Sequence, residues 1–385
     1  MYYRYRPFSE LSIKELMYSE LFLASTEECN DPYDSKGFYE FTGRQDYWEN
    51  LVNLLVRKIG NNNVSGLQIK EVAGKISSLC PLTYDEALLL DISRLCFEVL
   101  KDFTLSQSLA ACFNQLLKIY KPEPSYFACF SKADNDPLMW SHYASQHQGY
   151  SLIFKPIDGK LRQYPPLKKR SISRKTPNGL AQNSSYGLPE SFSFQEVIYQ
   201  EEVKSLCGFH RLPVAVIGGD LPEEERINLI TLQSEQFLHK HISWDYEQEV
   251  RVSISPRMSW IFGKNIELSS LERLFYYEPT QLVGIIFGAR MPKGNKDRLM
   301  EVLLYRQEQL YRSEDHERIM FEFAVFNARL SGSKREIQVE IDKMISSGQE
   351  IDKSHKNFEH AYDRWRNGWG IKFEGNKSNR IQVLG

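Results

Sequence analysis

Two acidic residues, Glu247 and Glu249, stand one residue apart in WDYEQEVRVSI, a segment at residues 244–254 with the composition of a β-strand. Residues i and i+2 of a strand share a face, so Glu247 and Glu249 are expected to point the same way, together with Asp245 and Arg251. Paired carboxylates cleave glycosidic bonds, because one stabilises the developing positive charge on the sugar and the other activates the nucleophile. A half-exposed strand that shows alternating charges to water explains the same pattern. The residues alone leave both readings open.

A second group of candidate residues follows the apolar segment SYFACFS, which is expected to form a buried strand ending at Ser131. The next segment, DPLMWSHYA, is expected to form a helix, because Asp136 is a good N-cap and proline is favoured in the first turn. Three side chains of this helix complete the group: Trp140, His142 and Tyr143. The plain structural alternative makes Trp140 and Tyr143 core residues and leaves His142 at the surface.

The chain begins with a third candidate group, the two arginines of YYRYRPF. Arg4 and Arg6 share a face if this segment is a strand. An arginine on an interior strand needs a partner, and the guanidinium fork matches the oxygens of phosphate. A strand at the molecular surface explains both arginines equally well.

The elements that must position these groups indicate an α+β protein with a mixed or antiparallel central sheet and an inserted all-helical subdomain. Strand-like segments occur near both ends of the chain, without regular alternation of strand and helix. Residues 156–190 have the composition of a surface loop. The expected organisation is listed in chain order: residues 1–45 begin the α+β core, 46–122 form the helical insertion, 123–330 complete the core and 331–385 form a C-terminal appendage.

The bulk composition narrows the class of protein. The chain has 385 residues, with 48 basic and 50 acidic side chains and a net charge of -2, which argues against a generally basic nucleic-acid binder. The six cysteines are scattered, which fits reduced thiols better than a disulfide framework. The start of the chain lacks the apolar stretch of a signal peptide, and no membrane association is expected. We therefore expect a cytoplasmic protein.

Several of these motifs together resemble a bacterial family known only as domain of unknown function 2971. They are YRYRPF, LFLAS and CNDPYD, then CFS, DPLMWSHYA and GYSLIF, then W-x-YE-x-E-x-R and VGIIFGARM. The resemblance covers about residues 2–45 and 123–330. It implies no particular activity.

A weaker resemblance implies one. The order of an arginine on strand one, a serine ending a middle strand and Glu-x-Glu opening a late strand is similar to the R-S-E pattern of ADP-ribosyltransferases, and the N-terminal segment is similar to that of DarT-type enzymes. This resemblance implies an ADP-ribosyltransferase-like core that cleaves NAD without a metal. The implied roles are as follows: Glu249 stabilises the sugar cation, Glu247 orients the nucleophile, Arg4 or Arg6 clamps the pyrophosphate, Ser131 braces the pocket, and Tyr143 or Trp140 packs on the nicotinamide with His142 in the same group.

The same resemblance implies ADP-ribose transfer or simple NAD hydrolysis, and a role as a toxin or phage-defence effector. It does not name the acceptor, which is protein, DNA or RNA. Two other classes stay open. His239 and His241, with His142 or Glu247, would suit a metal-dependent hydrolase of nucleic acid or nucleotide, although HKH follows a helical pattern. A non-enzymatic regulatory protein would use the basic KKRSISRK segment, or a partner docked on the tail motif DRWRNGWGIKF.

Overall fold

The computed structural model divides the chain into two compact units, which we describe separately. Unit 1 comprises Met1–Cys29, Ser125–Val197 and Ile242–Gly385, and unit 2 comprises Asn30–Pro124 and Ile198–His241. The structure describes the following residues: 1–31, 34, 38–42, 44–60, 63–79, 88–119, 126–164, 169–175, 181–187, 190–202, 205–212, 214–219, 222–254, 268–271, 273–312, 318–346, 348–367, 370–373 and 382–384. The expected boundary at 122/123 lies outside these residues.

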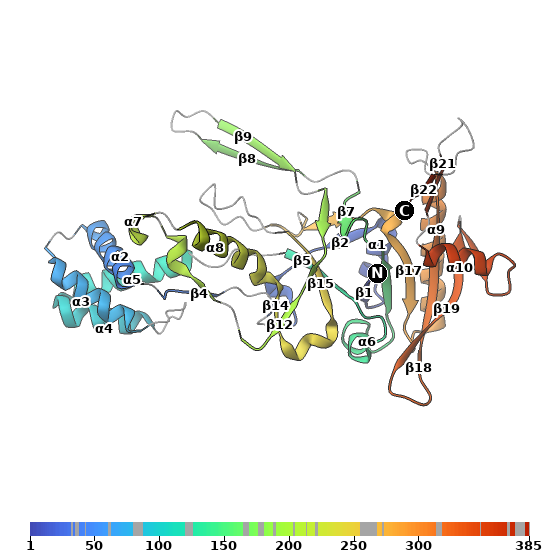
Figure 1. Cartoon of the computed structure of the whole chain (residues 1–385), viewed down its shortest axis with the longest axis horizontal. Coiled ribbons are helices and arrows are strands. Elements are labelled where there is room, and N and C mark those ends of the chain that lie inside the picture. Colours follow the sequence, from blue (N-terminus) through green and yellow to red (C-terminus); the bar gives the residue numbers. More distant parts are fainter. Residues whose placement is uncertain are drawn as a thin grey trace. The chain divides into compact units, whose positions relative to one another are not determined.

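A mixed, largely antiparallel sheet forms the centre of unit 1 (Figure 1). Its strands, in spatial order, are β11 (Gln195–Glu196), β15 (Glu249–Ile254), β5 (Tyr126–Ser131), β1 (Tyr2–Arg6), β6 (Tyr150–Phe154), β17 (Leu282–Phe287), β18 (Arg318–Leu330), β19 (Ile337–Ser346) and β20 (Gln349–Asp352). The short strands β3 (Ala24–Ser25), β21 (Gly370–Phe373) and β22 (Gln382–Leu384) pair alongside this path. Only β17 and β18 pair in parallel among these described strands. The predicted α+β class with a mixed sheet is confirmed at this level.

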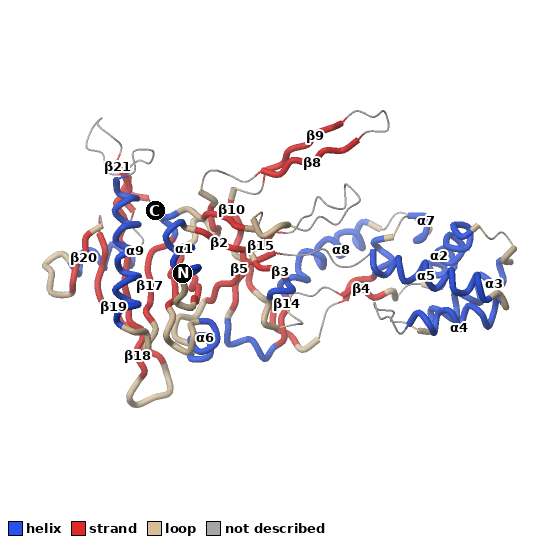
Figure 2. Tube along the Cα trace, turned by 180° about the vertical axis from the view of Figure 1, so that it is seen from behind, coloured by secondary structure: helices blue, strands red, loops and turns tan. Residues whose placement is uncertain are grey.

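Helices cover both faces of this sheet. Figure 1 shows α10 (Phe358–Arg366) in front of the strands, and the reverse view of Figure 2 brings α9 (Lys293–Arg312) to the front. We call the face packed against α1 (Glu10–Tyr18) and α9 the α9 face; it carries Phe130 and Val250. The opposite face, packed against α6 (Pro137–Tyr143) and α10, is the α6 face. Alternation along each strand decides which face a side chain occupies.

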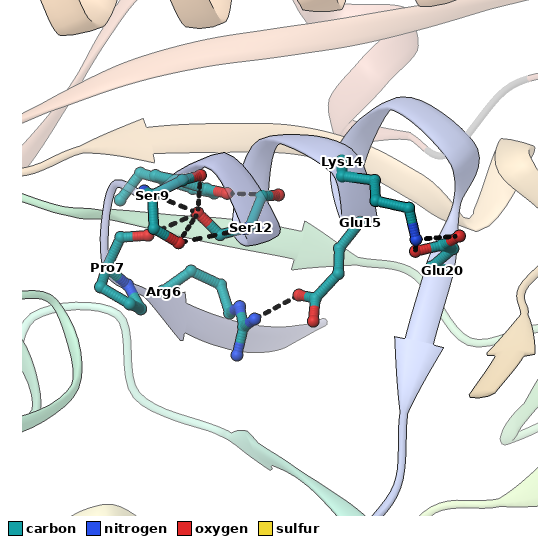
Figure 3. Close-up of polar contacts among 8 residues, drawn as sticks. Arg6, Pro7, Ser9, Ser12, Lys14, Glu15 and Glu20 are labelled. Atoms are coloured by element: carbon teal, nitrogen blue, oxygen red, sulfur yellow. Dashed lines mark hydrogen bonds and ion pairs between the residues drawn. The ribbon is translucent and has the colours of Figure 1, made fainter. Parts of the chain in front are cut away.

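Local sequence explains where the two N-terminal helices of unit 1 begin. The Asp136 carboxylate accepts hydrogen bonds from the backbone N–H groups of Leu138 (2.8 Å) and Met139 (3.0 Å), and Pro137 occupies the first turn of α6, as predicted. Helix α1 begins with a capping box between Ser9 and Ser12, drawn in Figure 3. These caps fix the residues at which α6 and α1 begin, and the two helices pack on opposite faces of the sheet.

The C-terminal segment is part of the sheet, so the expectation of an appendage at residues 331–385 is wrong. Strand β19 pairs with β18 along its length, and β20 extends the same edge. Phe358 and Ala361 of α10 are buried in the core of the α6 face, and the Trp365 indole N–H donates to the Val283 carbonyl at 2.8 Å. The apolar alternation of β19 is interrupted by charged residues, which is why the sequence pattern was weak here.

The expected surface loop at residues 156–190 contains strands. β8 (Lys169–Lys175) and β9 (Ala181–Gly187) form an antiparallel hairpin that includes most of KKRSISRK. The other small pairings of unit 1 join β7 (Lys160–Arg162) to β10 (Ser191–Ser193) and β2 (Glu20–Phe22) to β16 (Leu274–Tyr276). Short 3₁₀ helices complete unit 1: η1 (Thr26–Glu28), η4 (Ile242–Glu247) and η6 (Pro279–Gln281).

Unit 2 contains the helical block expected from the sequence, together with residues 198–241. Trp48 is 1% exposed and meets Phe209 edge to face, with ring centroids 4.7 Å apart, so the later segment shares the core of the helices. The elements of unit 2 are listed here: β4 (Phe38–Glu40), α2 (Gln45–Ile59), α3 (Gly66–Ser77), α4 (Leu88–Leu100), α5 (Phe103–Ile119), β12 (Ile198–Gln200), β13 (Ser205–Cys207), η2 (Gly208–Arg211), α7 (Val214–Ile217), α8 (Glu223–Glu235), η3 (Gln236–Leu238) and β14 (His239–His241).

Candidate active site

The two glutamates of the opening motif do not lie on one strand. Glu247 is the last residue of the 3₁₀ helix η4, and Glu249 is the first residue of β15. Between them Gln248 has φ 43°, in the left-handed region, so the chain turns sharply at this point. Both acids are nevertheless buried, with 2% exposure for Glu247 and 4% for Glu249. A half-exposed strand showing charges to water is therefore excluded.

Glu249 forms a buried ion pair with Arg251 on the same face of β15. The Arg251 guanidinium donates from Nε to Oε1 of Glu249 at 2.6 Å and from Nη2 to Oε2 at 2.9 Å. Arg251 is 0% exposed, and its guanidinium lies 4.3 Å from the centroid of the Phe127 ring. The bidentate contact fixes the orientation of the Glu249 carboxylate.

Ser131 links the two acids across the sheet. In the strand register Ser131 stands opposite Glu249 of β15 on one side and opposite Tyr3 of β1 on the other. Its hydroxyl donates to the backbone carbonyl of Glu247 at 2.7 Å and accepts from the Ala133 N–H at 3.0 Å. Residues that pair directly across strands share a face, so Tyr3, Ser131 and Glu249 form one row on the α6 face.

Half-exposed aromatic side chains adjoin Glu247. The Tyr143 hydroxyl donates to Oε1 of Glu247 at 2.5 Å, so α6 is joined to the end of η4. The His142 ring lies 6.3 Å from that of Tyr246, which in turn lies 6.0 Å from that of Trp244. His142 itself is exposed. This aromatic group can pack against a planar ligand ring beside the buried carboxylates.

The loop between β5 and α6 places a further carboxylate near this row. Burial and the Asp134 carboxylate together raise the pKa of Tyr3 to about 12, and the two side chains are hydrogen bonded. Burial also raises the pKa of Asp134, against the effect of its hydrogen bond with Tyr3. The Tyr5 hydroxyl donates to the Ala133 carbonyl at 2.9 Å. The loop is therefore tied to β1 by two tyrosines.

Trp140 is a core residue, so the expectation that it packs on a ligand is wrong. It is 0% exposed and lies edge to face with Tyr5, with ring centroids 5.1 Å apart. Its indole N–H donates to the Asp134 carbonyl at 2.9 Å. Of the three predicted helix residues, Tyr143 therefore contacts Glu247, His142 lies near Tyr246, and Trp140 anchors α6 to the sheet.

Arg4 and Arg6 do not meet Glu249. They pair with Leu152 and Tyr150 of β6, both in the core of the α9 face, whereas Glu249 and Ser131 lie on the α6 face. Arg6 forms an ion pair with Glu15 of α1, as Figure 3 shows. The pairing of β1 with its neighbours turns Arg4 and Arg6 toward the face of the sheet opposite the acids. The predicted convergence of these arginines with the acids is therefore wrong.

Arg4 has an incompletely satisfied guanidinium. Its Nη1 is buried and has no hydrogen-bond partner among the described residues. Burial lowers the pKa of Arg4 to about 10, and the positive charge of Arg6 contributes to the shift. The guanidinium lies 5.6 Å from the Phe130 ring centroid. Burial of the positive charge of Arg4 on the α9 face therefore opposes folding.

The residues proposed for a metal site fall in different units. His239 and His241 belong to β14 of unit 2, which is a strand and not the expected helix, whereas His142 and Glu247 belong to unit 1. Within the described residues no group of three or more His, Cys, Asp or Glu is placed to hold a metal ion.

The helices that the structure describes include none with the length and apolar character needed to cross a membrane.

Comparison with known proteins finds a similarity to one family over part of the chain. A family model described as "Protein of unknown function (DUF2971)" matches residues 139–252. The predicted family resemblance is confirmed over this segment. The match includes most of α6, all of η4 and most of β15, and therefore Tyr143, Glu247 and Glu249, whereas Tyr3 and Ser131 lie outside it. Neither a curated protein nor a solved structure matches the chain.

Sequence reasoning missed three residues of this site. Arg251 stood in the motif as E-V-R, and the i, i+2 spacing from Glu249 was a signal for their ion pair. Tyr3 and Asp134 gave no such signal, because their contact depends on the pairing of β1 with β5. Strand partners distant in sequence cannot be read from composition.

Proposed function

We propose that the acidic row on the α6 face cleaves the bond between nicotinamide and ribose in NAD, as an NAD glycohydrolase or ADP-ribosyltransferase. The observation that carries the proposal is the meeting of three distant segments. β15, β5 and β1 are neighbours in the sheet, and Glu249, Ser131 and Tyr3 stand in one row, with Glu247 hydrogen bonded to Ser131. The R-S-E resemblance likewise draws its residues from three strands, although the position on β1 that faces the row is Tyr3 and not an arginine.

The chemistry needs a fixed negative charge beneath a sugar that becomes cationic. Loss of nicotinamide passes through an oxocarbenium-like state, and a carboxylate held in place stabilises that state more than the ground state. Water-poor surroundings strengthen the effect. Two carboxylates of at most 4% exposure beside half-exposed aromatic rings provide this environment.

We assign the two acids by their contacts. Both oxygens of Glu249 accept hydrogen bonds from Arg251, so its charge is largely balanced within the protein. Glu247 is bonded to the half-exposed Tyr143 hydroxyl, at the edge where a ligand meets the row. In the proposal Glu247 faces the sugar cation, and the Glu249–Arg251 pair holds the start of β15. This gives Glu247 the role that the resemblance to ADP-ribosyltransferases implied for Glu249.

The remaining groups orient the substrate. The nicotinamide, or the part of NAD next to it, would pack against Tyr246, Trp244 and His142 in place of Trp140. Ser131 would hold the Glu247 backbone in position through its hydroxyl. Arg4 and Arg6 have no part in this version, because they lie on the other face of the sheet. The acceptor, whether water, protein or nucleic acid, enters after the bond to nicotinamide has broken.

The test is release of nicotinamide from NAD by the full chain, measured with water and with protein, DNA and RNA acceptors. We expect Glu247→Gln to lower the rate about 100-fold or more, because the amide keeps the shape and loses the charge. The matched control is Glu322→Gln. Glu322 is also buried and ion paired, with Arg364, and belongs to β18, five strand positions from β15, or about 24 Å.

Two results would count against the proposal. The first is a folded wild-type chain that releases no nicotinamide with any acceptor class. The second is equal loss of activity in Glu247→Gln and Glu322→Gln, which would indicate a general effect of removing a buried charge. NAD labelled in the adenylate half separates transfer from hydrolysis, because label becomes bound to the acceptor only in transfer. Growth arrest of bacteria that express the wild type and not Glu247→Gln would support a toxin or defence role.

A further inference from the structure

A cavity of about 250 Å³ opens at the exit of α6, in a part of unit 1 that the proposed NAD chemistry does not use. It is lined by Ser141, Gln146, His147, Arg290 and Leu330. Arg290 follows β17 and Leu330 is the last residue of the parallel strand β18, so the cavity lies where these two strands end. Four of the five lining residues are polar or charged, which is unusual for a gap left by imperfect packing.

The loop that forms one wall is held in a costly conformation. Ser145, Gln146 and His147 all have positive φ, at 46°, 55° and 70°, and none of them is glycine. Successive left-handed residues without glycine are rare, and they persist where the surroundings determine the backbone. The loop N–H groups are used internally: that of Gln146 donates to the Ser141 carbonyl at 3.1 Å, and that of His147 to the Trp140 carbonyl at 3.1 Å. A ligand in the cavity would therefore be contacted by the side chains of this loop and not by these backbone N–H groups.

Close backbone contacts lock this loop against the end of β17. The Arg290 N–H donates to the His147 carbonyl at 2.9 Å, and the Gly288 N–H donates to the Gly149 carbonyl at 2.9 Å. A Cβ atom at Gly288 would approach the His147 carbonyl oxygen to 2.3 Å, so only glycine permits the contact. The position of Arg290 beside His147 is thus set by the backbone and not by a flexible surface.

The charged and polar groups of the cavity match an anion. Arg290 is exposed and forms no ion pair with any residue that the structure describes. The Nδ1 atom of His147 is buried and lacks a hydrogen-bond partner among the described residues. Burial lowers the pKa of His147, and the positive charge of Arg290 lowers it further. Ser141 and Gln146 add a hydroxyl and an amide, both able to donate.

We propose that this cavity binds the phosphate group of a small organic phosphate, with Arg290 as its principal ligand and Ser141, Gln146 and His147 as further donors. The guanidinium fork suits phosphate oxygens. The volume exceeds that of a single ion several-fold, given about 30 Å³ for each water in the liquid. Leu330, which is 56% exposed, provides an apolar wall for the organic part of the ligand. The assignment does not depend on NAD cleavage.

The experiment titrates the full chain with ribose 5-phosphate, ribose, inorganic phosphate and acetate. Binding is measured by calorimetry and by the NMR signals of the His147 ring. We expect ribose 5-phosphate and inorganic phosphate to bind and ribose not to bind. Arg290→Gln should weaken phosphate binding about 10- to 100-fold, because one charge-assisted contact is lost. His147→Asn keeps a residue that tolerates positive φ and should weaken binding less.

The matched control is Arg329→Gln. Arg329 immediately precedes Leu330 and is 66% exposed at its side chain, in an ion pair with Glu340. Its loss changes the local charge equally but removes no cavity residue. We expect a dissociation constant in the millimolar range, so the absence of binding by the wild type at about 10 mM ribose 5-phosphate would overturn the proposal. Equal weakening of phosphate binding in Arg290→Gln and Arg329→Gln would also overturn it, as would binding of acetate in preference to phosphate. Unchanged thermal unfolding of both variants establishes that they are folded.

Discussion

The two faces of the sheet in unit 1 bury charge in opposite proportions. On the α9 face, burial raises the pKa of Tyr277, the charges of Arg306 and Arg4 lower it, and the charge of Glu15 raises it. On the α6 face, Glu247 and Glu249 are buried with Arg251 at the start of β15. Among the residues that the structure describes, arginines thus outnumber carboxylates around Tyr277, and carboxylates outnumber arginines at the start of β15.

This difference teaches that alternation along a strand decides where a charge is buried as much as residue type does. Tyr3 and Arg4 are neighbours in sequence, yet Tyr3 stands in the row with Ser131 and Arg4 points into the other core. A shift of one residue in the register of β1 would exchange them. The arginines of β1 therefore do not neutralise the acids, which is a condition of the proposed chemistry.

The largest expected effect comes from breaking the charge balance of the α6 face. Arg251→Ala should lower the free energy of unfolding by about 3–5 kcal/mol, because it leaves the buried Glu249 carboxylate without its bidentate partner. Urea unfolding measures the change. Arg329→Ala, at an exposed ion pair, should cost less than about 1 kcal/mol. A cost for Arg251→Ala as small as that of Arg329→Ala would show that the pair does not hold the strand.

The arginines of the α9 face should differ from each other. Arg6→Met leaves the buried carboxylate of Glu15 without its partner and should cost about 1–3 kcal/mol. Arg4→Met removes a guanidinium whose pKa burial lowers to about 10, so it should cost less than about 1 kcal/mol or stabilise the protein.

Each of these two variants is the control of the other, since both change Arg to Met on one face of one strand. The measurement is the midpoint and slope of urea unfolding at neutral pH. A larger loss for Arg4→Met than for Arg6→Met would contradict the comparison, because it would mean that Arg4 has a stabilising partner.

Much of the fold followed from local signals. The strand at the N-terminus, the cap at Asp136, the helical block and the buried strands at Phe127 and Ile285 were all predicted, because each depends on patterning within a short window. The tail at residues 331–385 was misjudged, since β19 gains its burial from pairing with β18 and not from its own apolar pattern.

The candidate site was predicted in part. Glu247, Glu249, Ser131 and Tyr143 do come together, from segments more than 100 residues apart. The turn at Gln248 could not be foreseen, because glutamine seldom adopts positive φ and only tertiary contacts hold it there. The face taken by Arg4 depended on a register that no local pattern specifies.

The smallest expected effect sharpens the picture of the α6 face. Burial raises the pKa of Asp134 in the folded protein above its ordinary value, so the folded state holds that proton more tightly than the unfolded state does. The stabilising contribution is therefore complete at a pH below the ordinary carboxyl value and is lost as the pH rises through the pKa of the folded state. At neutral pH the ionised carboxylate opposes folding.

Asp134→Asn should consequently stabilise the protein at pH 7, by less than about 1 kcal/mol because the carboxyl is only partly buried. The gain should disappear near pH 3, where Asp134 is also uncharged in both states, and the amide still accepts the Tyr3 hydrogen bond. Thermal unfolding of both proteins across this pH range measures the difference. Asp297→Asn, at an exposed ion pair with Lys293, should show no such gain. A loss of stability in Asp134→Asn at pH 7 would mean that the negative charge itself holds the loop to β1, and the excess of buried anions on this face would then be stabilised locally.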